Sequence, residues 1–81
     1  MKVVYFAWVR ERIGLASEEV ESSATTVAEL VAELEARAPR YAAAFEDPRA
    51  LRVALDQTLS DFDAPLEGVS EVAFFPPMTG G

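Results

Sequence analysis

The clearest pattern of hydrophobic and polar residues along the chain predicts one amphipathic helix near its middle. Thr26 followed by Glu29 has the spacing of a capping box, which marks the start of a helix. Pro39 disfavours helical geometry at the residue before it, so we expect the helix to end near Ala38. Apolar residues then recur at i, i+3, i+4 and i+7, which places them on one core-facing side: Val27, Leu30, Val31 and Leu34.

Runs rich in β-branched and aromatic residues predict strands on both sides of this helix. In the first run, alternation puts Val3, Tyr5 and Ala7 on the core face and Val4, Phe6 and Trp8 on the outer face. We expect strands at residues 2–8, 18–22, 51–55 and 71–75, a brief edge segment at 58–59, and short helical turns at 9–14 and 40–46.

The order of these elements predicts an α+β fold. Parallel neighbours need crossover connections, and only one long helix is present, so a mixed sheet wrapped over that helix satisfies the pattern. One hairpin on each side of the helix, with the first and last strands adjacent at the centre, is the β-grasp arrangement of ubiquitin-like domains. A ferredoxin-like fold is the alternative, but it needs two comparable helices. We expect one domain at residues 1–75 and a flexible tail at residues 76–81.

The charge balance limits the classes of partner. The chain has 81 residues and a formal net charge of −7, with Lys2 as its one lysine and six scattered arginines. A nucleic-acid or anionic-membrane surface is therefore not expected, whereas basic partner proteins fit; the acid excess also favours solubility. No apolar stretch reaches membrane-spanning length and no signal peptide precedes the first strand, so we expect a cytoplasmic protein.

The absence of cysteine and histidine removes most catalytic chemistry. Disulfides, thiolate nucleophiles, histidine bases and the usual zinc sites are excluded, and we expect no bound metal or cofactor. Asp61 and Asp63 are best interpreted as loop carboxylates without further ligands. A second acidic group is interpreted as a solvated edge: Glu18, Glu19 and Glu21.

The C-terminal sequence offers a reactive group of another kind. A carboxylate is a poor electrophile, but transfer of AMP from ATP gives it a good leaving group. Gly80 and Gly81 have no side chains to obstruct a narrow channel, and Pro76 and Pro77 reduce the entropy lost on insertion. The hypothesis is that the terminal carboxylate of Gly81 is activated and that Gly80 allows the tail to thread.

An apolar patch is predicted at the root of this tail. Phe75 faces outward from the last strand, Phe6 shares that face if the first and last strands are neighbours, and Leu59 is placed to extend the patch. Scattered exposed apolar residues are normal on any domain. Convergence with the tail favours a docking surface instead.

Several segments resemble the small subunit of molybdopterin synthase, over the whole chain. The start, Lys2-Val-Val-Tyr-Phe-Ala followed by Val9-Arg10-Glu11, is similar to that family, as are Asp56-Gln57-Thr58-Leu59 and Asp63-Ala64-Pro65-Leu66. The most specific part is Glu71-Val-Ala-Phe-Phe-Pro-Pro-Met-Thr-Gly-Gly81. Asp56 departs from the asparagine expected before Gln57, which affects a turn and leaves the chemistry untouched.

The resemblance implies a sulfur carrier of the ubiquitin-like type. A ubiquitin-activating-type enzyme would adenylate Gly81 with ATP, and a sulfurtransferase would convert it to a thiocarboxylate. The carrier would then give sulfur to cyclic pyranopterin monophosphate inside the large subunit, in a heterotetramer of two small and two large subunits. The chain would thus be part of an enzyme without being catalytic alone. The partner-facing residues implied are Phe6, Leu59, Phe75, Pro76, Pro77, Met78 and Thr79.

Three alternatives stay open. A carrier for thiamine thiazole synthesis shares the fold, tail and activation, although the Phe-Phe-Pro-Pro-x-Thr ending argues against it. A protein modifier would form isopeptide bonds through Gly81. A plain interaction domain would leave the tail inert.

Overall fold

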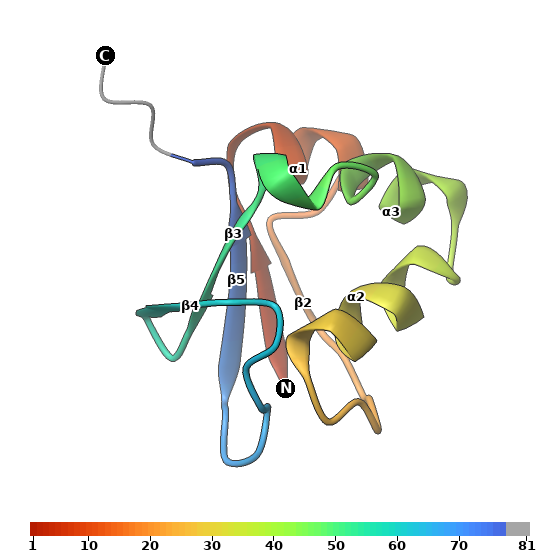
Figure 1. Ribbon diagram of the computed structural model, residues 1–81. Coiled ribbons are helices and arrows are strands. Elements are labelled where there is room, and N and C mark those ends of the chain that lie inside the picture. The colour runs from red at the N-terminus through yellow and green to blue at the C-terminus, as the bar shows by residue number, and fades with distance from the viewer. Residues whose placement is uncertain (78–81) are drawn as a thin grey trace.

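The computed structural model describes residues 1–77 as a mixed sheet with helices on one side (Figure 1). The five strands lie in the order β2-β1-β5-β3-β4. The predicted α+β, β-grasp architecture is confirmed. The elements in chain order are β1 (Lys2–Tyr5), α1 (Ala7–Ile13), β2 (Ser17–Glu19), α2 (Val27–Glu35), α3 (Pro39–Ala44), the 3-10 turn η1 (Pro48–Ala50), β3 (Arg52–Leu55), β4 (Thr58–Ser60) and β5 (Glu71–Phe75).

The centre of the sheet is β5, as the predicted adjacency of the first and last strands requires. It pairs in parallel with β1 and antiparallel with β3. The two hairpins, β1–β2 and β3–β4, are both antiparallel and form the two sides of the sheet. A strand buried between two others cannot be displaced without opening the whole sheet, so the exit of β5 is firmly fixed.

The first strand is shorter than predicted, because a helix replaces its last residues. β1 ends at Tyr5, and Phe6 is the extended N-cap of α1, its carbonyl accepting from the amide of Val9 at 3.1 Å. Ala7 and Trp8 therefore lie in α1, and their predicted places on the two sheet faces are wrong. Burial of one helical face outweighs the strand preference of Trp8, since Val9 and Ile13, one turn apart, are fully buried. The helix ends at Gly14 with a positive φ of 89°, as predicted.

The start of α2 agrees with the sequence, with one shift in the cap. The Thr26 hydroxyl accepts from the amide of Glu29 at 3.3 Å. The Glu29 carboxylate reaches back to Thr25 rather than Thr26, accepting from the Thr25 amide at 3.1 Å. The Thr25 hydroxyl also donates to this carboxylate, and the hydrogen bonds from the Thr25 hydroxyl and amide lower the pKa of Glu29. The apolar face is buried as predicted, with Val31 only partly so.

The end of α2 comes earlier than predicted. The helix stops at Glu35, whereas the sequence predicted an end near Ala38. Pro39 acts as the first residue of α3 rather than as a terminator, a position where its missing amide costs nothing. Ala38 is accordingly extended, with φ −164° and ψ 153°. The second short helix is thus confirmed, and Tyr41 is buried in it.

Asp56 and Gln57 form the tight turn between β3 and β4. Both have positive φ, 48° and 70°, which matches the twist of a two-residue hairpin. The Asp56 carboxylate accepts from the backbone amides of Ser70 and Glu71 at 3.0 and 2.9 Å. The departure at Asp56 therefore does lie in a turn, and it also fixes the start of β5.

The core lies between the sheet and the helices. Phe74 is fully buried at its centre. Its ring stacks on Tyr5 with centroids 6.3 Å apart and meets Phe45 edge-on at 5.0 Å. Within residues 1–77, the opposite face of the sheet carries no helix (Figure 1).

Candidate functional site: an apolar groove beside the C-terminal tail

The open sheet face carries a row of apolar side chains. Val4 of β1 lies opposite Ala73 of β5, which lies opposite Ala54 of β3, which lies opposite Leu59 of β4. Residues directly opposite each other in a sheet project to the same side. The row therefore crosses four strands, and Phe75 follows on the same face of β5.

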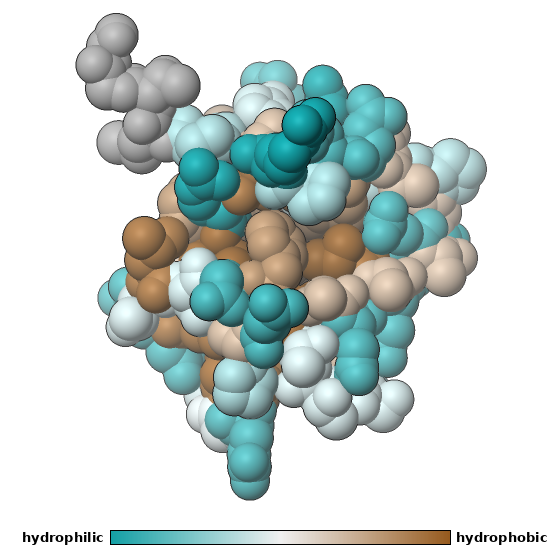
Figure 2. All heavy atoms as spheres, in the orientation of Figure 1, coloured by the Kyte–Doolittle hydropathy of each residue, from teal (hydrophilic) through white to brown (hydrophobic). Residues whose placement is uncertain are grey.

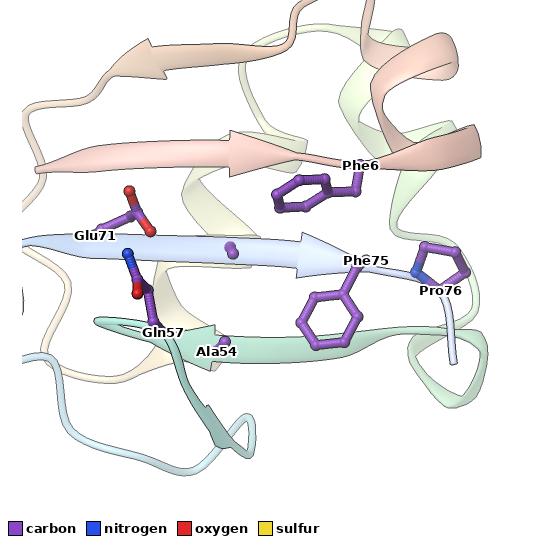
Figure 3. Close-up of a pocket in the computed structure, with 7 residues that line it drawn as sticks. Phe6, Ala54, Gln57, Glu71, Phe75 and Pro76 are labelled. Carbon is purple, nitrogen blue, oxygen red and sulfur yellow. The ribbon is translucent and has the colours of Figure 1, made fainter. Parts of the chain in front are cut away.

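A groove with a volume of about 550 Å³ occupies this face. Figure 3 shows Phe6, Phe75 and Pro76 at one end and Gln57 and Glu71 at the other. Phe6 is 49% exposed although it is a large apolar residue. We call this feature the outer groove, and its lining is Phe6, Ala54, Gln57, Glu71, Ala73, Phe75 and Pro76.

The structure brings together three of the predicted partner-facing residues. Phe6, Phe75 and Pro76 line one end of the outer groove. Leu59 is 68% exposed on the same sheet face but does not line the groove. Pro77 follows half-buried and is also outside the lining. The remaining predicted tail residues lie outside the described part of the chain: Met78, Thr79, Gly80 and Gly81.

Glu18 is not the solvated edge residue that the sequence predicted. Its Oε2 accepts hydrogen bonds from the hydroxyls of Tyr5 at 2.8 Å and Tyr41 at 2.7 Å. The guanidinium of Arg37 lies 3.6 Å from its Oε1. Burial, together with the hydrogen bond to Glu18, raises the pKa of Tyr5 far above its ordinary value.

A sequence signal for this cluster was present in the alternation of β2. Val20 is buried, so the residue two positions earlier must also point inward. Only an acceptor for buried hydroxyls makes an inward carboxylate tolerable. The cluster joins β1, β2 and α3 through their side chains, and we assign it to stability rather than to chemistry.

Neither a metal centre nor a membrane span is found in residues 1–77. No group of three or more acidic, histidine or cysteine side chains is placed to hold a metal ion there. Asp61 accepts from the amide of Asp63 at 3.0 Å, which is a local turn contact. No helix of that part is long and apolar enough to cross a membrane.

A second, smaller groove lies beside α2, on the other side of the molecule's core. Figure 2 shows hydrophobic surface across the middle of the face that presents α2 and β4. The smaller groove has a volume of about 260 Å³, and its lining includes Phe45 and Leu51. These side chains belong to the core, so this groove is a shallow depression where the surface residues cover the core incompletely.

The fold and the site together define a ubiquitin-like β-grasp protein with an apolar groove on its open sheet face. Among solved structures, the chain is similar to SAMP1 from Haloferax volcanii, with a TM-score of 0.78, 23% identity, and coverage of 100% of this chain and 98% of that one. It is also similar to a putative molybdopterin converting factor, subunit 1, from Pyrococcus furiosus, with a TM-score of 0.73, 26% identity and 95% coverage of each chain.

Sequence comparison narrows the class to a family. The chain is 47% identical over 81 residues to the molybdopterin synthase sulfur carrier subunit of Escherichia coli, covering 100% of this chain and 99% of that protein. It is 35% identical to the same-named subunit of Haemophilus influenzae, with the same coverage. A model described as the ThiS family matches residues 3–81. The chain belongs to the ThiS family, which confirms the resemblance found in its sequence.

Proposed function

We propose that this chain is the sulfur-carrier small subunit of a molybdopterin synthase. The observation that carries the proposal is the match along its full length, at 47% identity, to a protein of that name. The geometry supports it, because β5 leads the chain out of the centre of the sheet at the end of the outer groove. A partner that holds the groove therefore receives the residues after Pro76 at a defined point.

The proposed chemistry takes place at the Gly81 carboxylate. A carboxylate oxygen attacks the α-phosphorus of ATP on an adenylating partner, and pyrophosphate leaves. Sulfide-level sulfur delivered by a sulfurtransferase then attacks the acyl carbon and displaces AMP, which gives a thiocarboxylate. The thiocarboxylate donates its sulfur to cyclic pyranopterin monophosphate, and Gly81 returns to a carboxylate. Because molybdopterin holds two sulfurs, two charged carriers act for each product.

The partners supply everything else that the reaction needs. ATP binds to the activating enzyme, while the large synthase subunit binds the pterin and provides acid and base groups. We propose a cytoplasmic heterotetramer of two small and two large subunits. In it, Phe6 and Phe75 seat in the large subunit, Leu59 adds contact area, and Pro76 to Gly81 enter the active site. The chain itself binds no cofactor and is catalytic only within this assembly.

Intact-mass analysis tests the carrier role directly. The full-length chain is incubated with ATP, its adenylating partner and a sulfur source, and replacement of one oxygen by one sulfur at the C-terminus is expected. A variant lacking Gly81 should keep the melting temperature of the wild type, because β5 ends at Phe75, and should acquire no sulfur. Normal molybdopterin formation by this variant would refute the proposal.

The same preparation separates the alternatives. Adding the large subunit and pyranopterin monophosphate should discharge the sulfur into molybdopterin. Discharge only in a thiazole-forming system would assign the chain to thiamine synthesis instead. Gly81–lysine isopeptide adducts recovered from cells would identify a protein modifier.

A further inference from the structure

Two exposed arginines, Arg10 and Arg52, lie at the end of the outer groove where β5 ends. Arg52 lies opposite Phe75 in the β3–β5 register, so the two side chains project to the same sheet face. Arg10 lies one helical turn beyond Phe6, and its backbone amide donates to the Phe6 carbonyl at 3.4 Å. Both arginines are exposed. The two arginine positions thus lie beside the end of the groove where β5 leaves the sheet.

These two arginines have no carboxylate partner within residues 1–77. Arg52 uses one nitrogen, which donates to the carbonyls of Leu51 at 2.9 Å and Arg49 at 3.4 Å. A guanidinium has five N–H donors, so these bonds position the group and leave its other donors unused.

The neighbouring arginines, by contrast, are already engaged within the chain. The guanidinium of Arg12 lies 4.6 Å from the centre of the Trp8 ring and also donates to the carbonyl of Ala43. That of Arg49 pairs with Asp47 at 3.2 Å. Arg10 and Arg52 are therefore the two arginines of this end best placed to meet a partner.

The rest of the molecule has the opposite sign. The chain carries a net charge of −7, and most of its carboxylates belong to segments 18–21, 29–35 and 56–71. Figure 1 shows α2 and the loop before β5 away from α1, η1 and the end of β5. The other end of the outer groove is itself acidic, with Glu71 in its lining. Net charge alone predicted basic partners, but residues 6–14 and 45–52 beside the end of β5 carry four arginines against three carboxylates, Glu11, Glu46 and Asp47.

We infer that the protein that receives the tail presents carboxylates around the mouth of its channel, placed against Arg10 and Arg52, and an apolar side chain that fills the outer groove between them. This inference rests on the proposed function, since it describes the partner of the same tail. Guanidinium and carboxylate groups form bidentate, charge-assisted pairs, which fix orientation as well as attract. Such pairs fix how the carrier is rotated about the axis of its tail, whereas apolar contacts alone would not fix that rotation.

A protein fits these arginines better than a nucleotide does. Gly81 follows Phe75 by six positions, and an extended chain of that length spans about 20 Å. A nucleotide that reacts with Gly81 in a channel therefore lies far from Arg52. The groove between the arginines is lined mainly by apolar side chains, which a polyphosphate would not fill.

Charge reversal tests the inference with a matched control. Binding of the full chain to the synthase large subunit from the same organism is measured by titration calorimetry for the wild type, Arg10→Glu, Arg52→Glu and Lys2→Glu. Lys2 is exposed on the same sheet face but at its far end, where it lies opposite Glu71 in the β1–β5 register. All three variants make the same change in net charge. Melting temperatures identify any variant that folds poorly, and Arg10→Glu removes no side-chain hydrogen bond of residues 1–77.

Each arginine reversal is expected to raise the Kd about tenfold, whereas Lys2→Glu changes it less than about twofold. The wild-type Kd should rise with salt, and Arg10→Gln/Arg52→Gln should flatten that dependence. Equal effects of the three reversals, or tighter binding by the arginine variants, would overturn the inference while leaving the carrier role intact. So would ATP binding by the isolated chain that is lost in Arg52→Glu. Failure of the wild type to bind at all would remove the proposed function and the inference together.

Discussion

Replacing Tyr5 with phenylalanine should change the pH dependence of stability in a way that identifies the buried cluster. The Tyr5 side chain is 1% exposed, and its hydroxyl donates to the Glu18 carboxylate at 2.8 Å. Phenylalanine keeps the ring and its packing on Phe74 and removes only the hydroxyl. Glu18 keeps its hydrogen bond from Tyr41, so the carboxylate still has a hydroxyl donor in the variant.

The expected magnitude follows from the charge of the acceptor. A hydrogen bond to an ionised group contributes about 2 kcal/mol, so Tyr5→Phe should lose about that much stability at pH 7. The pKa of Tyr5 is raised well above its ordinary value near 10 in the folded state, by burial first and then by Glu18. Above pH 10 the unfolded chain releases the Tyr5 proton and the folded chain keeps it. The wild type therefore loses about 1.4 kcal/mol per pH unit there, relative to Tyr5→Phe.

These two effects cancel near pH 11.5, where the wild type and Tyr5→Phe should be equally stable. Urea unfolding from pH 7 to pH 11.5, followed by Trp8 fluorescence, measures the difference. All other ionisable groups are present in both proteins, so contributions common to the two cancel. A stability difference that stays constant across this range would refute the proposed burial of the Tyr5 hydroxyl against a carboxylate.

Two further substitutions test the site and the turn. Phe75→Ala should weaken binding to the large subunit at least tenfold while lowering the free energy of unfolding by only about 1 kcal/mol, because the ring is half-buried. Phe74→Leu should instead lower the free energy of unfolding more than it weakens binding. Calorimetry measures the binding of each variant, and urea unfolding measures its stability. Asp56→Ala should cost about 2 kcal/mol, because two amides at the start of β5 lose their acceptor, whereas Asp56→Asn keeps an acceptor oxygen and should cost much less. Equal melting temperatures for these two Asp56 variants would contradict the assigned role.

The sequence predicted β5 and its two faces correctly because the relevant signal is short-range. The period-two geometry of a strand places Phe74 and Phe75 on opposite faces whatever the rest of the chain does. The capped start of α2 was predictable for the same reason, since Thr26 acts on an amide three residues away.

The errors occurred where distant contacts decide. Trp8 has high strand propensity, but α1 forms because its buried face packs against α3, a contact that no local pattern shows. Pro39 ends one helix or starts the next according to where the following turn packs. In the sequence Glu18 looks like its acidic neighbours, and only the folded structure brings the hydroxyls of Tyr5 and Tyr41 to its carboxylate. Arg10 and Arg52 are far apart in sequence, so only the register of β5 shows that they flank one groove.

The central position of β5 also has a consequence for synthesis of the protein. β1 and β3 do not pair with each other, and β5 is the strand between them. A ribosome must therefore reach Phe75 before the sheet can close, and a chain terminated earlier leaves two open strand edges that cannot bury the core. Such fragments do not form the outer groove, so they cannot bind a partner through it. The topology thus acts as a check on completeness: the outer groove exists only on molecules synthesised at least as far as Pro76.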